Sequence, residues 1–550
     1  MSLHPQAFYL VPEETHHVAH AVFPKGNIYM QMHDELGMLY QDQQFASLFA
    51  TLGRPAISPT RLMLILVMQF AEHLTDRQAA DAVRARIDWK YALGLELTDA
   101  GFDFSVLSEF RDRLIANAFE AQILTTLLNQ FKALGLLKVR GRQRTDSTHV
   151  LAVVQNLNRL ELVGRTLQYA LNQLAQLAPD WLQENVPVVW FERYGRLVDE
   201  YRFPKGEGER RMLATTIGHD GRELLRWLAR ADAPDDAASL EAIHTLQMVW
   251  TQQFDDRDGQ LCWRSYAELP ASATRITSPY DHDARYSTKR SVTWVGYKLH
   301  MTETCDPDQP HLIVHVETTP ATDDDSTVIP TIHSQLAQIG QLPCTHIVDT
   351  GYTSGEHIET STSQYAVDLL GPVPADNSWQ AQDAQAFDLS TFRINWAEKQ
   401  AVCPQGNVNH HWHEEKGPRG KPTIQVQFRR SDCRVCPVRE RCTRSATASR
   451  TLTLHPQATH EALHQARQRQ ATDAFKQQYA SRAGIEGTLS QAVNEMGVRH
   501  ARYQGQAKTH LQHVLTAAAL NIRRVLAWWQ EIPRATTRKS AFAALAPARG

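Results

Sequence analysis

Three acidic residues stand where the sequence predicts the end of a buried strand or the start of a helix. Asp146 and Asp349 each close a predicted strand, and Glu486 opens a predicted helix. Bringing three carboxylates together costs charge repulsion, which bound cations offset. Hard oxygen ligands in an open site suit Mg²⁺ or Mn²⁺, and two such ions can support phosphoryl transfer. The three acids are therefore candidates for a metal-dependent site that acts on phosphate esters.

Each acid taken alone has a plainer explanation. Asp146 could begin an Asp-Ser-Thr turn, and Asp349 could shape the turn that leads into Gly351. Glu486 could be a solvated residue on the surface of its helix. The chemical interpretation therefore depends on a fold that brings the three side chains together.

Four cysteines form a second group, with a spacing that is typical of a metal site. The intervals between them are 29, two and five residues, and the members are Cys403, Cys433, Cys436 and Cys442. In a cytoplasmic protein this pattern predicts a tetrahedral structural Zn²⁺ site rather than disulfides. The close pair is the strong part of the pattern, whereas the distant Cys403 could be replaced by His410, His411 or His413. The alternative is that the thiols are reduced and merely packed.

The elements that would position the acids alternate between strands and helices. A strand between residues 137 and 148 is predicted to deliver Asp146 at its end, and the run 345–349 predicts another that ends at Asp349. Asp325 is expected to cap a helix that reaches about Gln338. The remaining segments predict one long helix and three strands, at 156–177, 292–301, 311–319 and 365–370. This order indicates a mixed α/β sheet with acids at strand ends.

The first part of the chain reads as a set of short helices. Helical spacing runs from residue 40 to about 135, with an N-cap at Thr75 and a further helix at 105–114. Such a unit can carry a helix-turn-helix that reads DNA. A dimerising or purely structural helical domain would show the same pattern.

Composition and charge distribution restrict the class of protein. Of the 550 residues, 42% are hydrophobic and 21% are charged, as in soluble globular domains, and no apolar run approaches the roughly 20 residues of a membrane span. The start of the chain lacks the pattern of a secretory signal, so a cytoplasmic location is expected. Residues 401–550 hold 23 basic and 9 acidic residues, against 34 and 51 before them. This asymmetry predicts a polyanion-binding surface, although a solvated basic helix bundle would also produce it.

Long segments of the chain resemble the DDE transposases of bacterial insertion sequences. The similarity runs over nearly the whole length, and the segments that carry it are 53–84, 143–167, 278–306, 346–352 (HIVDTGY), 479–491 (YASRAGIEGTLSQ) and 497–524. The resembled group has a helical amino-terminal domain, a four-cysteine insertion and a catalytic core similar to ribonuclease H. The resemblance implies binding of terminal inverted repeats, metal-dependent DNA cleavage and strand transfer.

The resemblance also assigns roles to single residues. Asp146, Asp349 and Glu486 take the places of the three catalytic acids, which would hold two Mg²⁺ (or Mn²⁺) ions per active site. Tyr479 and Arg482 fill the tyrosine and arginine positions before the glutamate. The group often has a basic residue seven places after the glutamate, where this chain has Val493, so the DNA-backbone contact would come from elsewhere. Substitutes for it are Arg499, Arg502 and Lys508.

We therefore expect a multidomain α/β protein with a ribonuclease H-like mixed-sheet core, a helical N-terminal domain, a helical insertion and a β-rich insertion with the cysteines. The expected boundaries are 1–135 (N-terminal domain), 136–155 (first part of the core), 156–285 (helical insertion), 286–380 (core), 381–456 (β-rich insertion), 457–530 (C-terminal core helices) and 531–550 (tail). The expected partners are double-stranded DNA, at transposon ends and target, and further copies of the chain in a homodimer or higher oligomer. No membrane is expected, and the location would be the cytoplasm of a bacterium, in association with the nucleoid. The alternatives are a domesticated DNA-binding regulator and a structure-selective nuclease on the same core.

Overall fold

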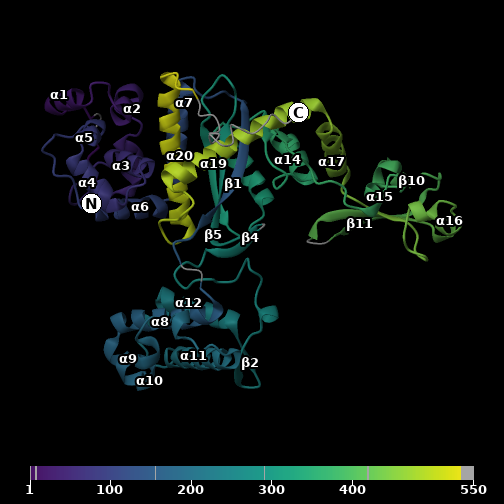
Figure 1. Cartoon of the computed structure of the whole chain (residues 1–550), viewed down its shortest axis with the longest axis horizontal. Coiled ribbons are helices and arrows are strands. Elements are labelled where there is room, and N and C mark those ends of the chain that lie inside the picture. Colours follow the sequence, from purple (N-terminus) through teal and green to yellow (C-terminus); the bar gives the residue numbers. More distant parts are fainter. Residues whose placement is uncertain (1, 6–8, 155–156, 290, 418–419, 534–550) are drawn as a thin grey trace, which may run out of the picture.

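The computed structural model describes residues 2–5, 9–154, 157–289, 291–417 and 420–533. A mixed sheet lies near the centre, with helices on its N-terminal side, a helical insertion below it in the view and a β-rich arm at the far right (Figure 1). The expected multidomain α/β architecture is confirmed. Among the helices in the described ranges, none has both the length and the apolar character needed to cross a membrane.

The N-terminal part consists of short helices whose starts are set by polar caps. The Thr75 side chain accepts a hydrogen bond from the backbone N–H of Gln78, and the Gln78 side chain accepts one from the backbone N–H of Thr75, so the predicted cap is confirmed. Ser58 caps the preceding buried helix, which begins with Pro59. The α-helices described in this part are α1 (Glu13–Val22), α2 (Ile28–Leu36), α3 (Pro59–Ala71), α4 (Asp76–Ala85), α5 (Ile87–Leu93), α6 (Ser105–Ala116) and α7 (Glu120–Ala133).

The central sheet has the strand order β4-β5-β1-β7-β8. β4 pairs with residues 292–296 of β5, and β6 pairs with residues 297–303 of the same strand. β1 runs antiparallel to β5 and parallel to β7, which itself runs parallel to β8. The strands are β1 (Arg142–Leu151), β4 (Arg285–Lys289), β5 (Val292–Thr304), β6 (Ile313–Pro320), β7 (Thr345–Ile347) and β8 (Asp368–Leu370). This curled mixed sheet is consistent with the expected ribonuclease H-like core.

The predicted secondary structure of the core needs three corrections. Residues 137–140 are not a strand, and β1 continues five residues beyond Asp146, so that acid lies inside the strand rather than at its end. The segment 365–370 is split, because Tyr365 ends a helix, α14 (Gly355–Tyr365), that the sequence did not indicate. The long helix α8 (Arg159–Leu177) begins after the Asn158 cap, and residue 156, where it was expected to start, lies outside the described residues.

One C-terminal helix joins the sheet to the N-terminal helices. α20 (Gln506–Trp529) packs on β6 and also on α3 and α7, and it stands between the two parts in the view (Figure 1). In this helix Leu511, Leu515, Ala518, Ile522 and Val525 are buried, whereas Trp529 at its end is exposed. The N-terminal helices and the sheet therefore share one hydrophobic core.

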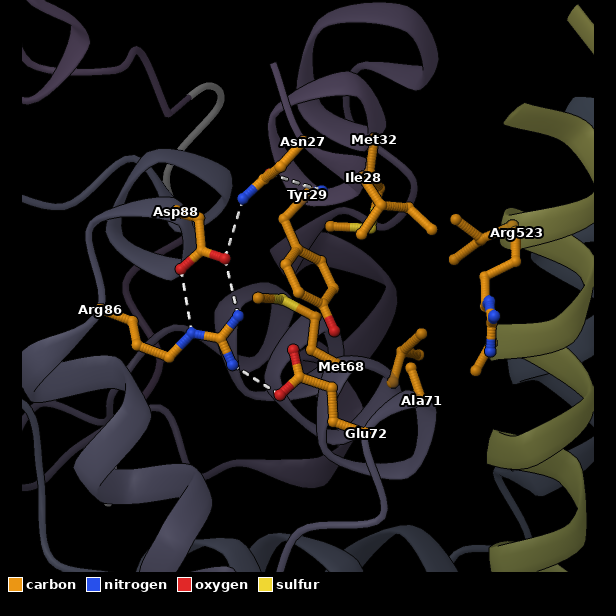
Figure 2. Close-up of a pocket in the computed structure, with 13 residues that line it drawn as sticks. Asn27, Ile28, Tyr29, Met32, Met68, Ala71, Glu72, Arg86, Asp88 and Arg523 are labelled. Carbon is orange, nitrogen blue, oxygen red and sulfur yellow. Dashed lines mark hydrogen bonds and ion pairs between the residues drawn. The ribbon is translucent and has the colours of Figure 1, made fainter. Parts of the chain in front are cut away.

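A cavity of about 390 Å³ remains between these N-terminal helices and α20. Its polar wall is an ion-paired group in which Arg86 contacts both Glu72 and Asp88, while Arg523 of α20 faces it from the other side (Figure 2). Arg523 pairs in turn with Glu495. Because each charged side chain in its lining already has an ion-pair partner, this cavity is best explained as part of the joint between the two parts.

Two insertions extend from the sheet. The first is the helical one, whose own hydrophobic core is formed by α8, α9 (Pro179–Asn185), α10 (Val188–Tyr194), α11 (Glu207–Trp227), α12 (Glu241–Gln253) and the hairpin β2 (Phe254–Arg257) and β3 (Gln260–Trp263). The second is the arm, which comprises α15 (Trp379–Gln382), β9 (Arg393–Asn395), β10 (Gln400–Val402), β11 (Asn409–Lys416), β12 (Pro422–Phe428), α16 (Arg430–Arg434) and β13 (Thr451–Leu454). The chain returns to the sheet through α17 (Gln457–Gln470), α18 (Asp473–Ala480) and α19 (Gly484–Met496), and α13 (Ile329–Gln338) follows β6.

Candidate active site

Asp146 and Asp349 are neighbours because of how two parallel strands end. β7 pairs with β1 only as far as Arg144 and stops at Ile347. Asp349 follows two residues later, beside the part of β1 that carries Asp146. The backbone N–H groups of Ser147 and Gly351 donate to Oδ1 of Asp146 and Asp349, respectively, each at 2.8 Å. One carboxylate oxygen of each acid is thus fixed by backbone.

Glu486 reaches the same place from the first turn of α19. The helix is fixed to the sheet by Glu303, which is fully buried and pairs with Arg144 at 2.6 Å and with Arg524 at 2.8 Å. Thr488 of α19 donates to the same carboxylate at 2.6 Å. Burial alone would raise the pKa of Glu303, but Arg524 and Arg144 hold it below its usual range.

Gly484 lets α19 begin close to the sheet. A Cβ atom at this position would lie 2.2 Å from Nη1 of Arg144, so a larger residue would force the helix and the guanidinium apart. The Arg144 guanidinium also donates to the carbonyl of Ser481, just before the helix. These contacts set the position of Glu486 relative to β1.

Arg482 contacts all three acids. Its Nη2 lies 2.6 Å from Oδ2 of Asp146 and 3.9 Å from Oδ2 of Asp349. Its Nη1 lies 2.9 Å from Oε1 of Glu486, one helical turn away. The three carboxylates, from three separate elements, therefore converge on a single cation.

The electrostatics of this group follow from partial burial. Burial raises the pKa of Asp146, Arg482 opposes the shift, and the nearby Asp349 adds to it. Burial also disfavours the charged guanidinium of Arg482, but Asp146, Tyr479, Asp349 and Glu486 together outweigh this effect and raise its pKa. Nε of Arg482 is buried and has no hydrogen-bond partner among the described residues. The site thus holds an excess of negative charge and one unused donor.

Tyr479 lies beside the acids. Its ring stacks on Phe475 at a centroid distance of 5.5 Å, and burial raises its pKa, with a further upward contribution from Asp349 against the opposing charge of Arg482. Tyr479 is therefore close enough to the acids to feel their charge.

A fourth acid, which sequence reasoning missed, adjoins the group. Asp325 was expected to cap a helix, but it lies within the first turn and makes no cap bond; the N-cap residue is Asp324. Its carboxylate instead pairs with Lys298 at 2.9 Å and with Lys289 at 3.3 Å, and it accepts a bond from Ser147, next to Asp146, at 3.4 Å. Lys298 was the available signal, because a cation within an apolar strand needs an acidic partner.

Asp325 also approaches Asp349. A Cβ atom on Gly351 would lie 3.0 Å from Oδ1 of Asp349 and 3.5 Å from Oδ2 of Asp325. Gly351 therefore lies against both carboxylates. The side of the site formed by β4, β5 and the turn before α13 thus supplies two lysines and one further acid.

The other expected DNA-binding residues lie apart from this group. Arg499 donates to Thr148 of β1 at 3.1 Å. Arg502 donates to the carbonyl of Leu74 at 2.6 Å and contacts His73, and Lys508 pairs with Asp112 at 2.9 Å. Arg502 and Lys508 therefore connect the C-terminal part to the N-terminal helices, and their role in DNA binding stays a prediction.

The four predicted cysteines meet at the end of the arm. Cys403 follows β10, Cys433 lies in α16, and all four, with Cys436 and Cys442, line one cavity of about 30 Å³. Among the described residues, no histidine lines it. Burial raises the pKa of Cys442 to about 11, and the other three thiols add to the shift.

The donor types at both places suit the expected metals, although within the described ranges no three His, Cys, Asp or Glu side chains are already spaced to hold an ion. At the acids, the suitability for Mg²⁺ or Mn²⁺ is supported by the convergence of three carboxylates on the cationic side chain of Arg482. At the cysteines, it is the set of four sulfur donors around one small cavity.

Comparison with protein-family models gave two matches. Residues 402–526 match a transposase DDE domain, and residues 17–113 match a transposase domain (DUF772). The first match includes Glu486 and all four cysteines of the arm, but it begins after Asp146 and Asp349. Searches of curated proteins and of solved structures found no match.

Proposed function

We propose that this chain, which its two family matches indicate to be an insertion-sequence DDE transposase, binds the terminal inverted repeats of its element and catalyses DNA cleavage and strand transfer. The observation that carries the proposal is the convergence of Asp146, Asp349 and Glu486 on Arg482. Carboxylates brought this close from three elements are typical of a cation site that acts on phosphates. The protein would work as a homodimer or higher oligomer on bacterial chromosomal DNA.

In this proposal the three acids hold two Mg²⁺ or Mn²⁺ ions. When bound, these ions supply Lewis-acid stabilisation of the charge that develops at the scissile phosphate. The backbone N–H groups of Ser147 and Gly351 keep Asp146 and Asp349 oriented. The Glu303 network keeps α19, and so Glu486, against the sheet.

Arg482 has a second task in the proposal. Its guanidinium offsets part of the negative charge of the acids before metal and DNA bind, and its Nε, which has no partner among the described residues, offers a donor to a phosphate oxygen. A planar guanidinium suits phosphate recognition because it presents several N–H groups in one plane. Arg482 would thus move its contacts from carboxylate to phosphate as the site fills.

The same acids would serve two successive displacements. In the first, a water oxygen attacks phosphorus at the transposon end, the bond to the 3′ oxygen breaks, and the water proton passes to solvent. In the second, the freed 3′-OH attacks a target phosphodiester and displaces its 3′ oxygen. Neither step needs a covalent protein nucleophile, because the electrostatic stabilisation comes from the site.

The test uses the purified full chain with labelled end duplexes and Mg²⁺. A transposase should release a 3′-OH at the element boundary and should join a pre-cut end to a target plasmid. Cleavage without joining would indicate the structure-selective nuclease instead. Specific end binding without either reaction would indicate the DNA-binding regulator.

A further inference from the structure

The end of the arm carries an unusual density of positive charge. Between residues 429 and 450 there are seven arginines and only two acids, Asp432 and Glu440. None of these arginines forms an ion pair with a described carboxylate, in contrast to Arg482 and Lys508, which both do. Two of the residues expected from sequence to bind DNA, Arg482 and Lys508, thus have acidic partners, whereas the arginines of the arm have none among the described residues.

Two of the seven arginines are structural. Arg439 and Arg450 line the cysteine cavity, and Arg439 donates to the carbonyls of Ser445 and Ala448 at 2.8 Å each. The other five are exposed at the surface around the cysteines, and we call them the arginine surface: Arg429, Arg430, Arg434, Arg441 and Arg444.

Several guanidinium groups of the arginine surface are held in place without being neutralised. Nε of Arg430 donates to the carbonyl of Thr447 at 2.6 Å. Arg441 lies 4.4 Å over the ring of Phe387, and Arg444 lies 4.6 Å over the ring of Trp379. For all three, the terminal Nη nitrogens have no hydrogen-bond acceptor in the described part of the chain. Restrained planar donors of this kind suit bidentate contacts to phosphate.

We propose that the arginine surface binds the sugar–phosphate backbone of double-stranded DNA. The inference rests on the proposed function, because only a protein that acts on DNA would meet this partner. α16, which carries Arg430 and Arg434, lies at the outer end of the arm, far from the sheet (Figure 1). The contact would therefore hold a stretch of duplex away from the scissile phosphate, and it would add affinity without reading bases.

The test compares the full-length wild-type protein with the triple variant Arg429→Ala, Arg430→Ala and Arg434→Ala. Binding to end and scrambled duplexes is measured over a salt series. In a plot of the logarithm of the binding constant against the logarithm of salt concentration, each lost phosphate contact should lower the magnitude of the slope by about 0.9. The triple variant should therefore lower this magnitude by up to about 2.7. The fall should be equal for both duplexes. The matched control removes three exposed basic side chains of the helical insertion that have no described ion pair: Lys205, Arg211 and Arg226. Its slope should equal that of wild type.

The outcomes separate the two proposals. If the triple variant has an unchanged slope and the wild type cleaves end DNA, the proposal that the arginine surface binds DNA is wrong, and the transposase function is unaffected. A wild type that neither cleaves nor binds DNA in a salt-dependent way would overturn both. If the triple variant fails to fold, Arg434→Gln decides the question, because this side chain makes no hydrogen bond or ion pair to a described residue. An unchanged slope for Arg434→Gln would then overturn the proposal, and a fall of about 0.9 would support it.

Discussion

Nη2 of Arg482 lies 2.6 Å from Oδ2 of Asp146, although 336 residues separate the two along the chain. The same guanidinium reaches Glu486 and Asp349, so it stands where the three carboxylates would share a divalent ion. An arginine and a metal ion cannot both sit between the same oxygens. We therefore expect Arg482 to give up at least one of these contacts when a divalent ion binds.

Removal of any one of the three acids should abolish Mg²⁺-dependent cleavage. Asp146→Ala, Asp349→Ala and Glu486→Ala should each lower the rate by at least about 10²-fold, the scale for losing one electrostatic catalyst. End binding should change little, because affinity comes mainly from basic contacts to phosphates. Cleavage and gel-shift assays on the same duplex measure the two effects.

Glu495→Ala is the matched control for this series. Glu495 lies nine residues after Glu486 on the same helix, which places it on the opposite face, and it pairs there with Arg523 at 2.8 Å. This variant should cleave at the wild-type rate. Substantial cleavage by any single acid variant would remove that residue from the proposed site.

Asp146→Asn should stabilise the fold at neutral pH while it abolishes cleavage. Because burial raises the pKa of Asp146, the folded chain favours the protonated carboxyl more than the unfolded chain does. The stability that this group contributes is complete below its unfolded pKa of about 3.9 and is lost as pH rises through the higher folded pKa. At pH 7.5 the wild type therefore carries the cost of a buried charge, which Asn removes.

Thermal unfolding of wild type and Asp146→Asn over a pH series measures this effect. The melting temperature of the variant should exceed that of wild type at pH 7.5, and the gap should narrow as pH falls toward 4. A variant that melts below wild type at pH 7.5 would mean that the Arg482 pair outweighs burial at this site.

Local pattern was enough to predict two of the core strands and one helix cap. Alternation of apolar and polar residues predicted β5 and β6, and the Thr75 cap followed from its capping-box sequence. Pattern could not predict where β1 would end, because β1 continues along β5 after its pairing with β7 has stopped. Strand ends depend on partners from elsewhere in the chain.

The roles of charged side chains were harder to predict than their presence. Asp325 stands where the sequence predicts a helix cap, yet it pairs with Lys298 of β5 and Lys289 of β4. Arg502 is a residue type that often binds phosphate, yet it donates to the main-chain carbonyl of Leu74 in the N-terminal part. In both cases the partner is distant in sequence, so local pattern could not reveal which two residues would pair.

The purified protein should carry about one tightly bound zinc per chain, the content of one four-cysteine site. Cys433→Ser or Cys436→Ser should lose it and should expose the arm to proteases, because the small apolar core of the arm needs metal binding to stay ordered. Elemental analysis and limited proteolysis measure the two effects. Cys344→Ser, at an exposed cysteine outside the group, is the control and should retain the metal. Freshly prepared, unchelated protein without zinc would contradict the assignment.

Arg502→Ala should destabilise the protein more than it weakens DNA binding. The side chain donates to the carbonyl of Leu74 and lies 4.7 Å over the ring of Phe70, so it fastens the C-terminal part to α3 and the turn after it. Its loss leaves a carbonyl without its charged donor, which costs about 1–3 kcal/mol in the free energy of unfolding. Lys508→Ala breaks only an exposed ion pair and should cost about 1 kcal/mol or less. Urea unfolding of both variants gives the comparison, and the salt dependence of end binding is measured in parallel. An Arg502→Ala protein with wild-type stability and a flatter salt slope would instead make Arg502 a phosphate ligand, as its sequence first suggested.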